Sequence, residues 1–445
     1  MTRHARSDAP GAARRWVVAL AAGLVLTGAA AAALAPLVAP SPGAGVAAAE
    51  GPPAASGTLT PTITPSPTPT PTPTPDPDAQ FTIVAAGDVL PHLPVLSSAR
   101  TAGGGYDFSP VLAGLDPWVQ GADLALCHLE VPVAPPGTAP SGYPMFATPA
   151  EIAAALRAQG WDGCSTASNH SVDRGFKGVT ATLDALDAAG LGHVGTARSA
   201  IEQSQPQLYR LGRAGQQITV AHIAAAYGTN GMPIDADKPW SVNLIDVPAL
   251  VAQATAARAA GADLVVASVH CCVEYVTDPT TEQGAIDQQL ADSGVIDLVI
   301  GHHAHVPQPV VKLTGGPRGE GMWVAYGLGN YVSNQDGACC FVKTDSGLLL
   351  TAHVESAGAF TAERRAAGPA RVTGVEWTPI TVDRRSGHQV HALVDIAGGT
   401  GTLSAAEVAA RAARVVEAAG VQAPQRTTAP TLTGDAPVVV PRTAG

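Results

Sequence analysis

The sequence is poor in charge and contains no run of basic residues beyond its N-terminus. Only 14% of its 445 residues are charged, and the formal net charge is -11. Nucleic-acid-binding domains carry a basic patch or stripe. The composition therefore argues against nucleic acid as a partner. The low charge and the abundance of alanine and glycine are a compositional bias that indicates no function by itself.

Several common signatures are also missing. The run Gly103-Gly104-Gly105 is not followed by the Gly-Lys-Ser/Thr of a P-loop, and no Gly-x-Ser-x-Gly elbow is present. The six cysteines do not have zinc-finger spacing. Their even number is instead typical of a protein in an oxidising compartment, where disulfides persist.

The N-terminal segment has the features of an export signal. Arginines between Arg3 and Arg15 precede an uncharged apolar run, Trp16–Val38, which is long enough to span a bilayer. Ala47-Ala48-Ala49 resembles a signal-peptidase site. We expect residues 1–49 to be a cleaved signal peptide or a single membrane anchor. Either would place the remainder outside the cytoplasm, secreted or anchored at the cell surface.

Composition divides the rest of the chain into four parts. Residues 50–80 are a Pro/Thr repeat, which favours an extended, semi-rigid spacer. We expect one large domain over 81–395 and a C-terminal helix within 396–420. The Pro/Thr-rich tail, 421–445, is predicted to be disordered.

Apolar runs alternate with helical stretches in the large domain. This alternation predicts a largely parallel sheet with helices on both faces. The predicted helices cover 149–159, 176–189, 248–260, 282–292 and 404–419. The predicted strands cover 81–86, 123–129, 161–166, 218–224, 263–269, 296–300 and 322–326, with further β-structure between 347 and 393.

Polar side chains follow six of the predicted strands at the point where each ends. Ligands of open α/β sheets bind outside the carboxyl ends of the strands, so these side chains are expected to converge. Carboxylate, amide and imidazole together are the inventory of a two-metal hydrolytic site, and mixed nitrogen and oxygen ligands favour Zn, Mn or Fe over Ca or Mg. The residues are Asp88, Glu130, Asn169, His170, His270, His303, His305 and Asn330.

The ordered set of motifs resembles the CapA family, the poly-γ-glutamate capsule biosynthesis proteins, which are similar to calcineurin-like metallophosphoesterases. The resemblance runs from about residue 81 to 333 and more weakly to 395. It implies an α/β/β/α sandwich with the site at the carboxyl ends of the strands. The motifs are Gly87-Asp88-Val89-Leu90-Pro91-His92, Leu129-Glu130, Ser168–Gly175, His270 with Glu274-Tyr275, Gly301–Gln308 and Gly327-Leu328-Gly329-Asn330.

The resemblance also implies roles for individual residues. Two divalent transition metals would be held by Asp88, Glu130, Asn169, His270, His303 and His305, with Glu130 in the place of the bridging carboxylate. His170 would be the neighbouring acid that assists the leaving group, next to Asn169. Five further residues are candidates for binding metal or for supporting the ligands: His92, His302, Glu274, Asp173 and Asn330.

Two of these five depart from the spacing of the superfamily. His303 and His305 keep the Gly-His-x-His spacing, so His302 is expected to pack or to form a hydrogen bond instead. His92 lies four residues after Asp88, where the superfamily has Asp-x-His. Its interpretation stays open between a ligand and a loop histidine near the site.

The cysteines add a feature that the family pattern does not require. Cys271-Cys272 stands where the family has Trp-Gly, and Cys339-Cys340 lies near the Gly-Asn segment. Two vicinal pairs suggest one or two cross-links between these loops. Cys127 and Cys164 would form a further disulfide if their strands are neighbours. We expect such disulfides to brace the loops that carry the ligands.

Three functions remain compatible with these features. The leading one is an extracytoplasmic, metal-dependent phosphoester hydrolase that acts in making, exporting or anchoring an anionic poly-γ-glutamate-type surface polymer. An amide-linked polymer has no phosphoester, and a fold does not settle a substrate. A non-catalytic, polymer-binding component of a membrane synthase or export complex and an amide hydrolase or transferase are therefore alternatives.

Overall fold

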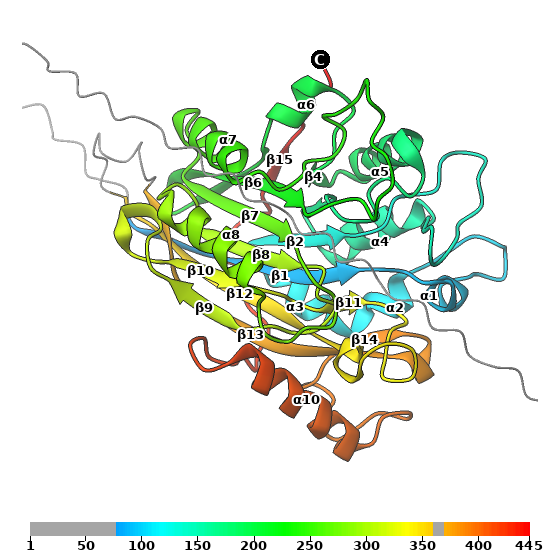
Figure 1. The fold of residues 1–445 in the computed structure, drawn as a ribbon. Helices are drawn as coiled ribbons and strands as arrows, with labels where there is room; N and C mark the ends of the chain where they lie inside the picture. The colour runs from blue at the N-terminus through cyan, green and yellow to red at the C-terminus, as the bar shows by residue number, and fades with distance from the viewer. Residues whose placement is uncertain (1–76, 359–368) are drawn as a thin grey trace, which may run out of the picture. The chain divides into compact units, whose positions relative to one another are not determined.

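The computed structural model describes residues 77–358 and 369–445. The expected signal or anchor, 1–49, and nearly all of the 50–80 spacer lie outside the described residues. Among the described helices, none combines the length and the apolar character that a membrane crossing requires. The described residues form helices packed around two β-sheets (Figure 1).

The first sheet is mixed and has eight strands. Its central strands β1 to β4 are parallel, and β12 to β14 continue the sheet antiparallel on the other side of β1. Its order is β14 (Gln389–Ala392), β13 (Ala370–Asp383), β12 (Ser346–Ser356), β1 (Ala79–Val89), β2 (Leu124–Leu129), β3 (Gly163–Ser165) and β4 (Gly192–Val194), with β11 (Asn330–Val332) beside β1.

The second sheet has seven strands, and β6, β7, β8 and β10 form its parallel centre. Its order is β15 (Val438–Val440), β5 (Gln207–Arg213), β6 (Gln216–Ala226), β7 (Leu264–His270), β8 (Leu298–His302), β10 (Met322–Ala325) and β9 (Val310–Leu313). The expectation of a single, largely parallel sheet, which came from the strand–helix alternation, is thus wrong. The parallel segments are divided between two mixed sheets.

The two sheets pack face to face because their strands are apolar on both sides. Successive side chains of a strand point to opposite faces. In β1, Ile83 and Ala85 belong to the core between the sheets, where Val220 and Val266 of the second sheet also lie. Val84 and its neighbours on that side belong to a separate core beneath the helices.

Helices cover the outer face of each sheet and confirm the α/β/β/α sandwich. The first sheet is covered by α1 (Leu93–Ser98), α2 (Ser109–Leu112), α3 (Asp116–Gln120), α4 (Glu151–Gln159) and α5 (Gly175–Ala189). The second is covered by α7 (Val247–Ala259) and α8 (Thr281–Asp292). The short α6 (Ala200–Ser204) precedes β5.

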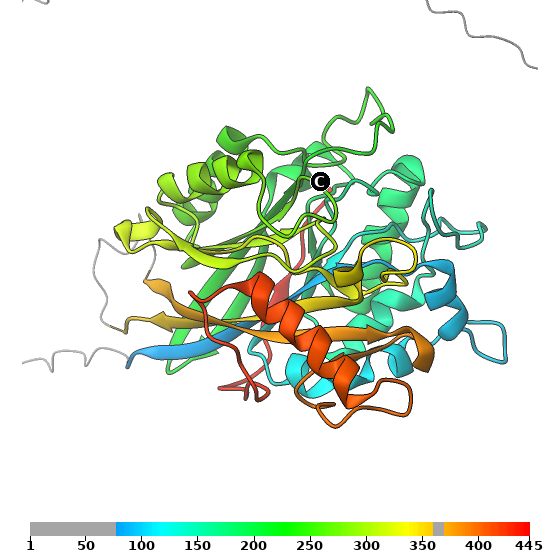
Figure 2. The same ribbon diagram turned by 60° about the horizontal axis from the view of Figure 1, so that its bottom comes forward.

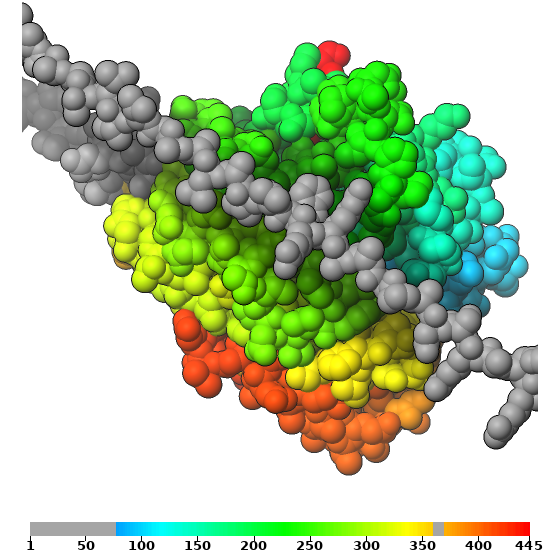
Figure 3. Space-filling model, in the orientation of Figure 1, coloured from blue at the N-terminus to red at the C-terminus, as the bar shows by residue number. Residues whose placement is uncertain are grey.

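The predicted C-terminal helix is present as α10 (Ala405–Ala419). A capping box fixes its start: Ser404 accepts from the backbone of Glu407, and the Glu407 carboxylate accepts from the backbone of Ser404. The helix ends at Gly420 and packs against β12 and β13 (Figure 2). In the space-filling view it lies along the lower edge of the molecule (Figure 3).

The expectation of a disordered tail over 421–445 is wrong. Val438–Val440 forms β15, which pairs antiparallel with β5. Beyond it, the buried side chain of Arg442 donates to the backbone oxygens of His193, Thr196 and Glu202. A short valine strand and one buried arginine therefore fix a segment whose Pro/Thr content suggested disorder.

Candidate metal centre

The pairing register of the strands places the polar side chains next to one another at the ends of the strands. Asp88 at the end of β1 pairs with Asn330 of β11 on one side and with His128 of β2 on the other. In the second sheet, His270 at the end of β7 pairs with His302 at the end of β8. Residues from both sheets thus meet at the carboxyl ends of the parallel strands, as the sequence predicted.

The loops that follow β2, β3 and β8 add four more residues, whose side chains are all buried: Glu130, Asn169, His303 and His305. His303 and His305 have φ angles of +84° and +55°. Such left-handed conformations are uncommon for residues with a side chain and are often found at functional sites. The loop after β8 therefore accepts backbone strain at the two positions that carry the imidazoles.

One imidazole lies between two buried carboxylates. Nδ1 of His305 is 3.1 Å from Oδ2 of Asp88, and its Nε2 is 3.6 Å from Oε1 of Glu130. Burial opposes the charged form of His305, but Glu130 and Asp88 outweigh it and raise its pKa to about 10. Burial also opposes the ionisation of Asp88, but His302 and His305 hold its pKa well below the usual range.

Several buried polar atoms of the cluster lack a hydrogen-bond partner among the described residues. They include both carboxylate oxygens of Glu130, both ring nitrogens of His302 and Nδ1 of His303. Burial raises the pKa of Glu130 well above its usual range. Unpartnered buried polar atoms are costly, and a bound cation is one way to satisfy them. The residues therefore fit a metal ion.

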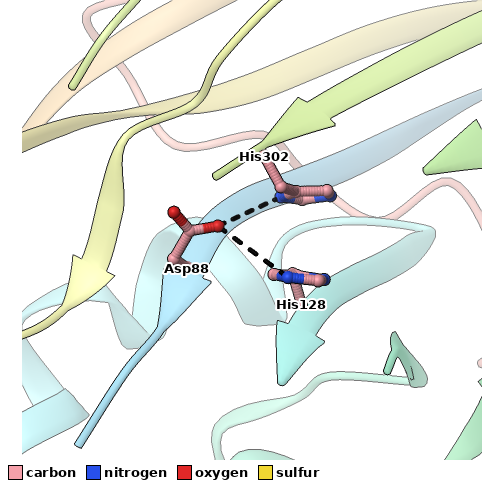
Figure 4. Close-up of side chains that lie close together, drawn as sticks. All are labelled: Asp88, His128 and His302. Carbon is pink, nitrogen blue, oxygen red and sulfur yellow. Dashed lines mark ion pairs between the residues drawn. The ribbon is translucent and has the colours of Figure 1, made fainter. Parts of the chain in front are cut away.

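Candidate ligand atoms gather in three overlapping groups, each with its atoms within 4.8 Å of one another. Burial lowers the pKa of His270, and it lowers that of His303 to about 3, so burial favours the neutral form of both rings. Mixed nitrogen and oxygen donors suit Zn, Mn or Fe. The groups are Asp88–Glu130–His305, Glu274–His303–His305 and Asp88–His128–His302, of which Figure 4 shows the last.

Asn169 and His270 form a further pair of candidate ligands. Oδ1 of Asn169 is 2.9 Å from Nε2 of His270, and its Nδ2 donates to Oδ1 of Asn230. The hydrogen bond to Asn230 fixes the amide so that its oxygen faces His270. Oδ1 of Asn169 and Nε2 of His270 thus lie side by side, as two ligand atoms of one metal ion do.

His170 lies in the same loop as Asn169 and has a carboxylate behind it. Its Nδ1 is 2.8 Å from Oδ2 of Asp173, and that oxygen also accepts from the backbone N–H of Phe146. Asp173 therefore holds the ring through Nδ1, and Nε2 is the atom that can serve a reaction. This arrangement agrees with an assisting acid rather than a ligand.

The other candidates differ in how close they come to the ligands. Glu274 is exposed but reaches the ligand group of His303 and His305. Asn330 holds His305, with its Oδ1 3.1 Å from Nδ1 of that ring. His92 belongs to none of the three groups: its Nδ1 contacts the Leu90 oxygen, and burial lowers its pKa to about 4. The structure thus gives no support to a ligand role for His92, and its role stays a prediction.

Sequence reasoning overlooked His128. The residue is buried inside the apolar strand β2, whereas the pattern that marks the other candidates is a polar residue directly after a strand. A signal was nevertheless present, because His128 precedes Glu130 by two residues. Two residues apart along an extended chain, side chains point to the same face.

The cysteines pair differently from the expected inter-loop cross-link. Cys127 and Cys164 are bonded between the neighbouring strands β2 and β3. Cys271, however, is bonded to its neighbour Cys272, and Cys339 and Cys340 are free and exposed. The prediction of a cross-link between the two vicinal pairs is therefore wrong. The bond next to His270 closes within one loop.

A known protein family matches the part of the chain that contains the candidate metal centre. The family model of the bacterial capsule synthesis protein PGA_cap matches residues 82–335. The chain belongs to this family. The match includes every strand-end residue of the cluster, from Asp88 to Asn330.

Two curated relatives carry names from the same biology. A probable polyglutamine synthesis accessory protein of Mycobacterium tuberculosis is 29% identical over 230 residues, which cover 48% of this chain and 57% of that protein. The PGA biosynthesis protein CapA of Bacillus subtilis is 26% identical over 196 residues, 44% of this chain and 47% of that protein. The chain thus spans about half the length of these relatives.

Solved structures with a related arrangement are more distant in sequence. The NAD nucleotidase of Haemophilus influenzae matches with a TM-score of 0.43 and 13% identity, covering 76% of this chain and 60% of that one. The calcineurin-like phosphoesterase YfkN of Bacillus subtilis matches with a TM-score of 0.39 and 14% identity, covering 76% and 97%.

Proposed function

We propose that this capsule synthesis family member is a metal-dependent hydrolase that acts on a phosphoester. The observation that carries the proposal is the pair of buried carboxylates, Asp88 and Glu130, which lie on either side of the imidazole of His305. Both oxygens of Glu130 lack a hydrogen-bond partner among the described residues. Buried polar atoms nearly always have a partner because an unpartnered one costs free energy, and a bound divalent cation would be the partner of these oxygens.

The proposed ligands divide into two sets. Asp88, Glu130 and His305 would hold one ion, and His303, with Glu274 at the rim, extends that set. Asn169 and His270 would hold the other. When bound, two such ions activate a water molecule and stabilise the charge that develops on the phosphoryl oxygens.

His170 is the residue that favours catalysis over simple binding. Asp173 fixes its ring through Nδ1 at a distance of 2.8 Å. A ring held in this way can pass a proton from Nε2 to a leaving oxygen. A protein that only bound polymer carboxylates through metals would have no use for an oriented proton donor beside the ligands.

The biological setting that we propose follows the family and the names of its relatives. The hydrolase would act outside the cytoplasm, on a precursor or linkage of an anionic poly-γ-glutamate-type surface polymer. A membrane synthase or export complex is the proposed partner. The basic N-terminus, the apolar run and the Pro/Thr spacer support this placement, because together they would hold a domain away from a membrane.

Metal analysis combined with ester hydrolysis tests this function. The protein is loaded with zinc or manganese and assayed on bis(p-nitrophenyl) phosphate, together with Asp88→Ala and His303→Ala. We expect both variants to lose metal and at least about a hundredfold in rate, since both remove a ligand of the ions that activate the water. His353→Ala is the matched control, because His353 pairs with Glu376 on β12 and β13, away from the cluster.

The same assay separates the alternatives. Bound metal without hydrolysis of any ester or amide would favour the polymer-binding component. Release of glutamate oligomers from poly-γ-glutamate, without ester hydrolysis, would favour an amide hydrolase. Either result would overturn the proposed phosphoesterase activity.

A further inference from the structure

His128 lies inside the metal centre, but both of its ring nitrogens are already engaged. Its Nδ1 is 2.7 Å from Oγ of Ser165, and its Nε2 is 3.0 Å from Nδ1 of His270. The distance from Nε2 to Oδ1 of Asp88 is longer, at 3.9 Å. His128 thus connects the first sheet to His270 of the second sheet.

Ring geometry argues against His128 and His302 as ligands of one ion. The two rings stack with centroids 4.0 Å apart and planes inclined by 17°. Figure 4 shows them one above the other beside Asp88. The lone pair of an imidazole lies in the ring plane, and a Zn–N bond is about 2.0–2.1 Å long. Two nearly parallel rings cannot direct their lone pairs at a single ion.

Ser165, His128 and His270 form instead a continuous chain of hydrogen bonds. Nε2 of His270 is 2.9 Å from Oδ1 of Asn169, which can only accept a hydrogen bond. In the metal-free protein Nε2 of His270 therefore carries the hydrogen, and its Nδ1 accepts from Nε2–H of His128. Nδ1 of His128 accepts in turn from the hydroxyl of Ser165.

Metal binding by His270 would require the hydrogen bonds between Ser165, His128 and His270 to run in the opposite direction. A metal-binding Nε2 of His270 must offer its lone pair, so the hydrogen moves to Nδ1. Nδ1–H then donates to Nε2 of His128, and Nδ1–H of His128 donates to Ser165. A serine hydroxyl both donates and accepts. The hydrogen bonds between Ser165, His128 and His270 can therefore form in either direction without any movement of the heavy atoms.

We propose that His128, supported by Ser165, is a positioning residue that holds His270 in its metal-binding orientation and tautomer. Nε2 of His270 and Oδ1 of Asn169 then face the same ion. The inference rests on the proposed function, because it concerns one of the ions which that function requires. Strand register supports it, since His128 and Ser165 are direct neighbours on β2 and β3.

Zinc binding by His128→Leu, His128→Gln and Ser165→Ala tests the proposal. Affinity is measured by competition with a chromophoric chelator, and the number of imidazoles per zinc by X-ray absorption at saturating zinc. Leucine removes both hydrogen bonds and should lower the affinity for one of two ions by about 10–100-fold. Glutamine places an amide near the position of Nε2 and should restore most of it. Ser165→Ala should cause a smaller loss.

The stoichiometry and the imidazole count should stay unchanged in all three variants. A lower imidazole count in His128→Leu at saturating zinc would make His128 a ligand and overturn the proposal. Wild-type affinity in His128→Leu, or a loss that glutamine does not restore, would also overturn it. If the leucine variant does not fold, the glutamine and Ser165→Ala variants carry the test. A wild-type protein that binds no zinc would instead refute the proposed function.

Discussion

Nδ1 of His305 lies 3.1 Å from Oδ2 of Asp88, and the other nitrogen of the same ring faces Glu130. One imidazole thus lies between the two carboxylates that would hold one of the proposed ions. Its raised pKa shows how strongly these carboxylates attract positive charge.

Glu130→Gln separates a metal ligand from a structural carboxylate. Burial raises the pKa of Glu130, and neither of its oxygens has a hydrogen-bond partner among the described residues. The amide should therefore lower metal affinity at least about tenfold but leave the unfolding free energy of the metal-free protein unchanged or slightly higher. Calorimetric titration and urea denaturation measure the two quantities. A metal-free variant that loses several kcal/mol would instead show that the carboxylate stabilises the fold.

Asp287 should give the folded protein a measurable pH dependence. Burial raises the pKa of this helix α8 carboxyl to about 8, and its Oδ1 has no hydrogen-bond partner among the described residues. Between about pH 4 and pH 8 the folded state holds a proton that the unfolded state releases, so stability falls as pH rises, by up to about 1.4 kcal/mol per unit.

The substitution Asp287→Asn should flatten this dependence and stabilise the protein at pH 8 more than at pH 5. Urea denaturation at the two pH values measures it, and Asp292→Asn, an exposed change on the same helix, is the control. An equal effect of Asp287→Asn at both pH values would contradict the prediction.

Thiol counting tests the cysteine pairing. The native protein should contain two alkylatable thiols, Cys339 and Cys340, and six after reduction and unfolding. Reduction of the Cys127–Cys164 bond should cost about 2–4 kcal/mol of unfolding free energy, because the bond links two buried strands. Mass spectrometry of the alkylated protein gives the counts. Four or six thiols in the native protein would refute the assigned bonds.

Arg442→Ala tests the ordered C-terminal segment. The guanidinium donates to the backbone oxygens of His193, Thr196 and Glu202, and the truncation would leave these buried acceptors unsatisfied. We expect a loss of about 3 kcal/mol of unfolding free energy. Val438→Ala, in the same segment but 62% exposed, should change stability by less than about 0.5 kcal/mol. Equal effects of the two changes would argue against the role of Arg442.

Local patterns in the sequence predict most of the fold and of the site. Apolar runs mark β1, β2, β7 and β8, and the polar residues after them mark the candidate ligands that the structure brings together. The division into two sheets escapes such reasoning, because it depends on pairings between distant segments, such as β1 with β12. His128 was missed because an apolar strand surrounds it. The ordered tail was missed because one buried arginine and three valines outweigh its Pro/Thr content.

Metal content is the most direct test of the central claim, that the strand-end cluster is a two-metal centre. The protein is purified without chelator, dialysed, and analysed by inductively coupled plasma mass spectrometry, before and after incubation with Zn, Mn or Fe. We predict close to two equivalents of transition metal per chain, and about one in Asp88→Ala, which loses a ligand of one of the two ions. A wild-type chain that contains no metal and takes up none would contradict the account.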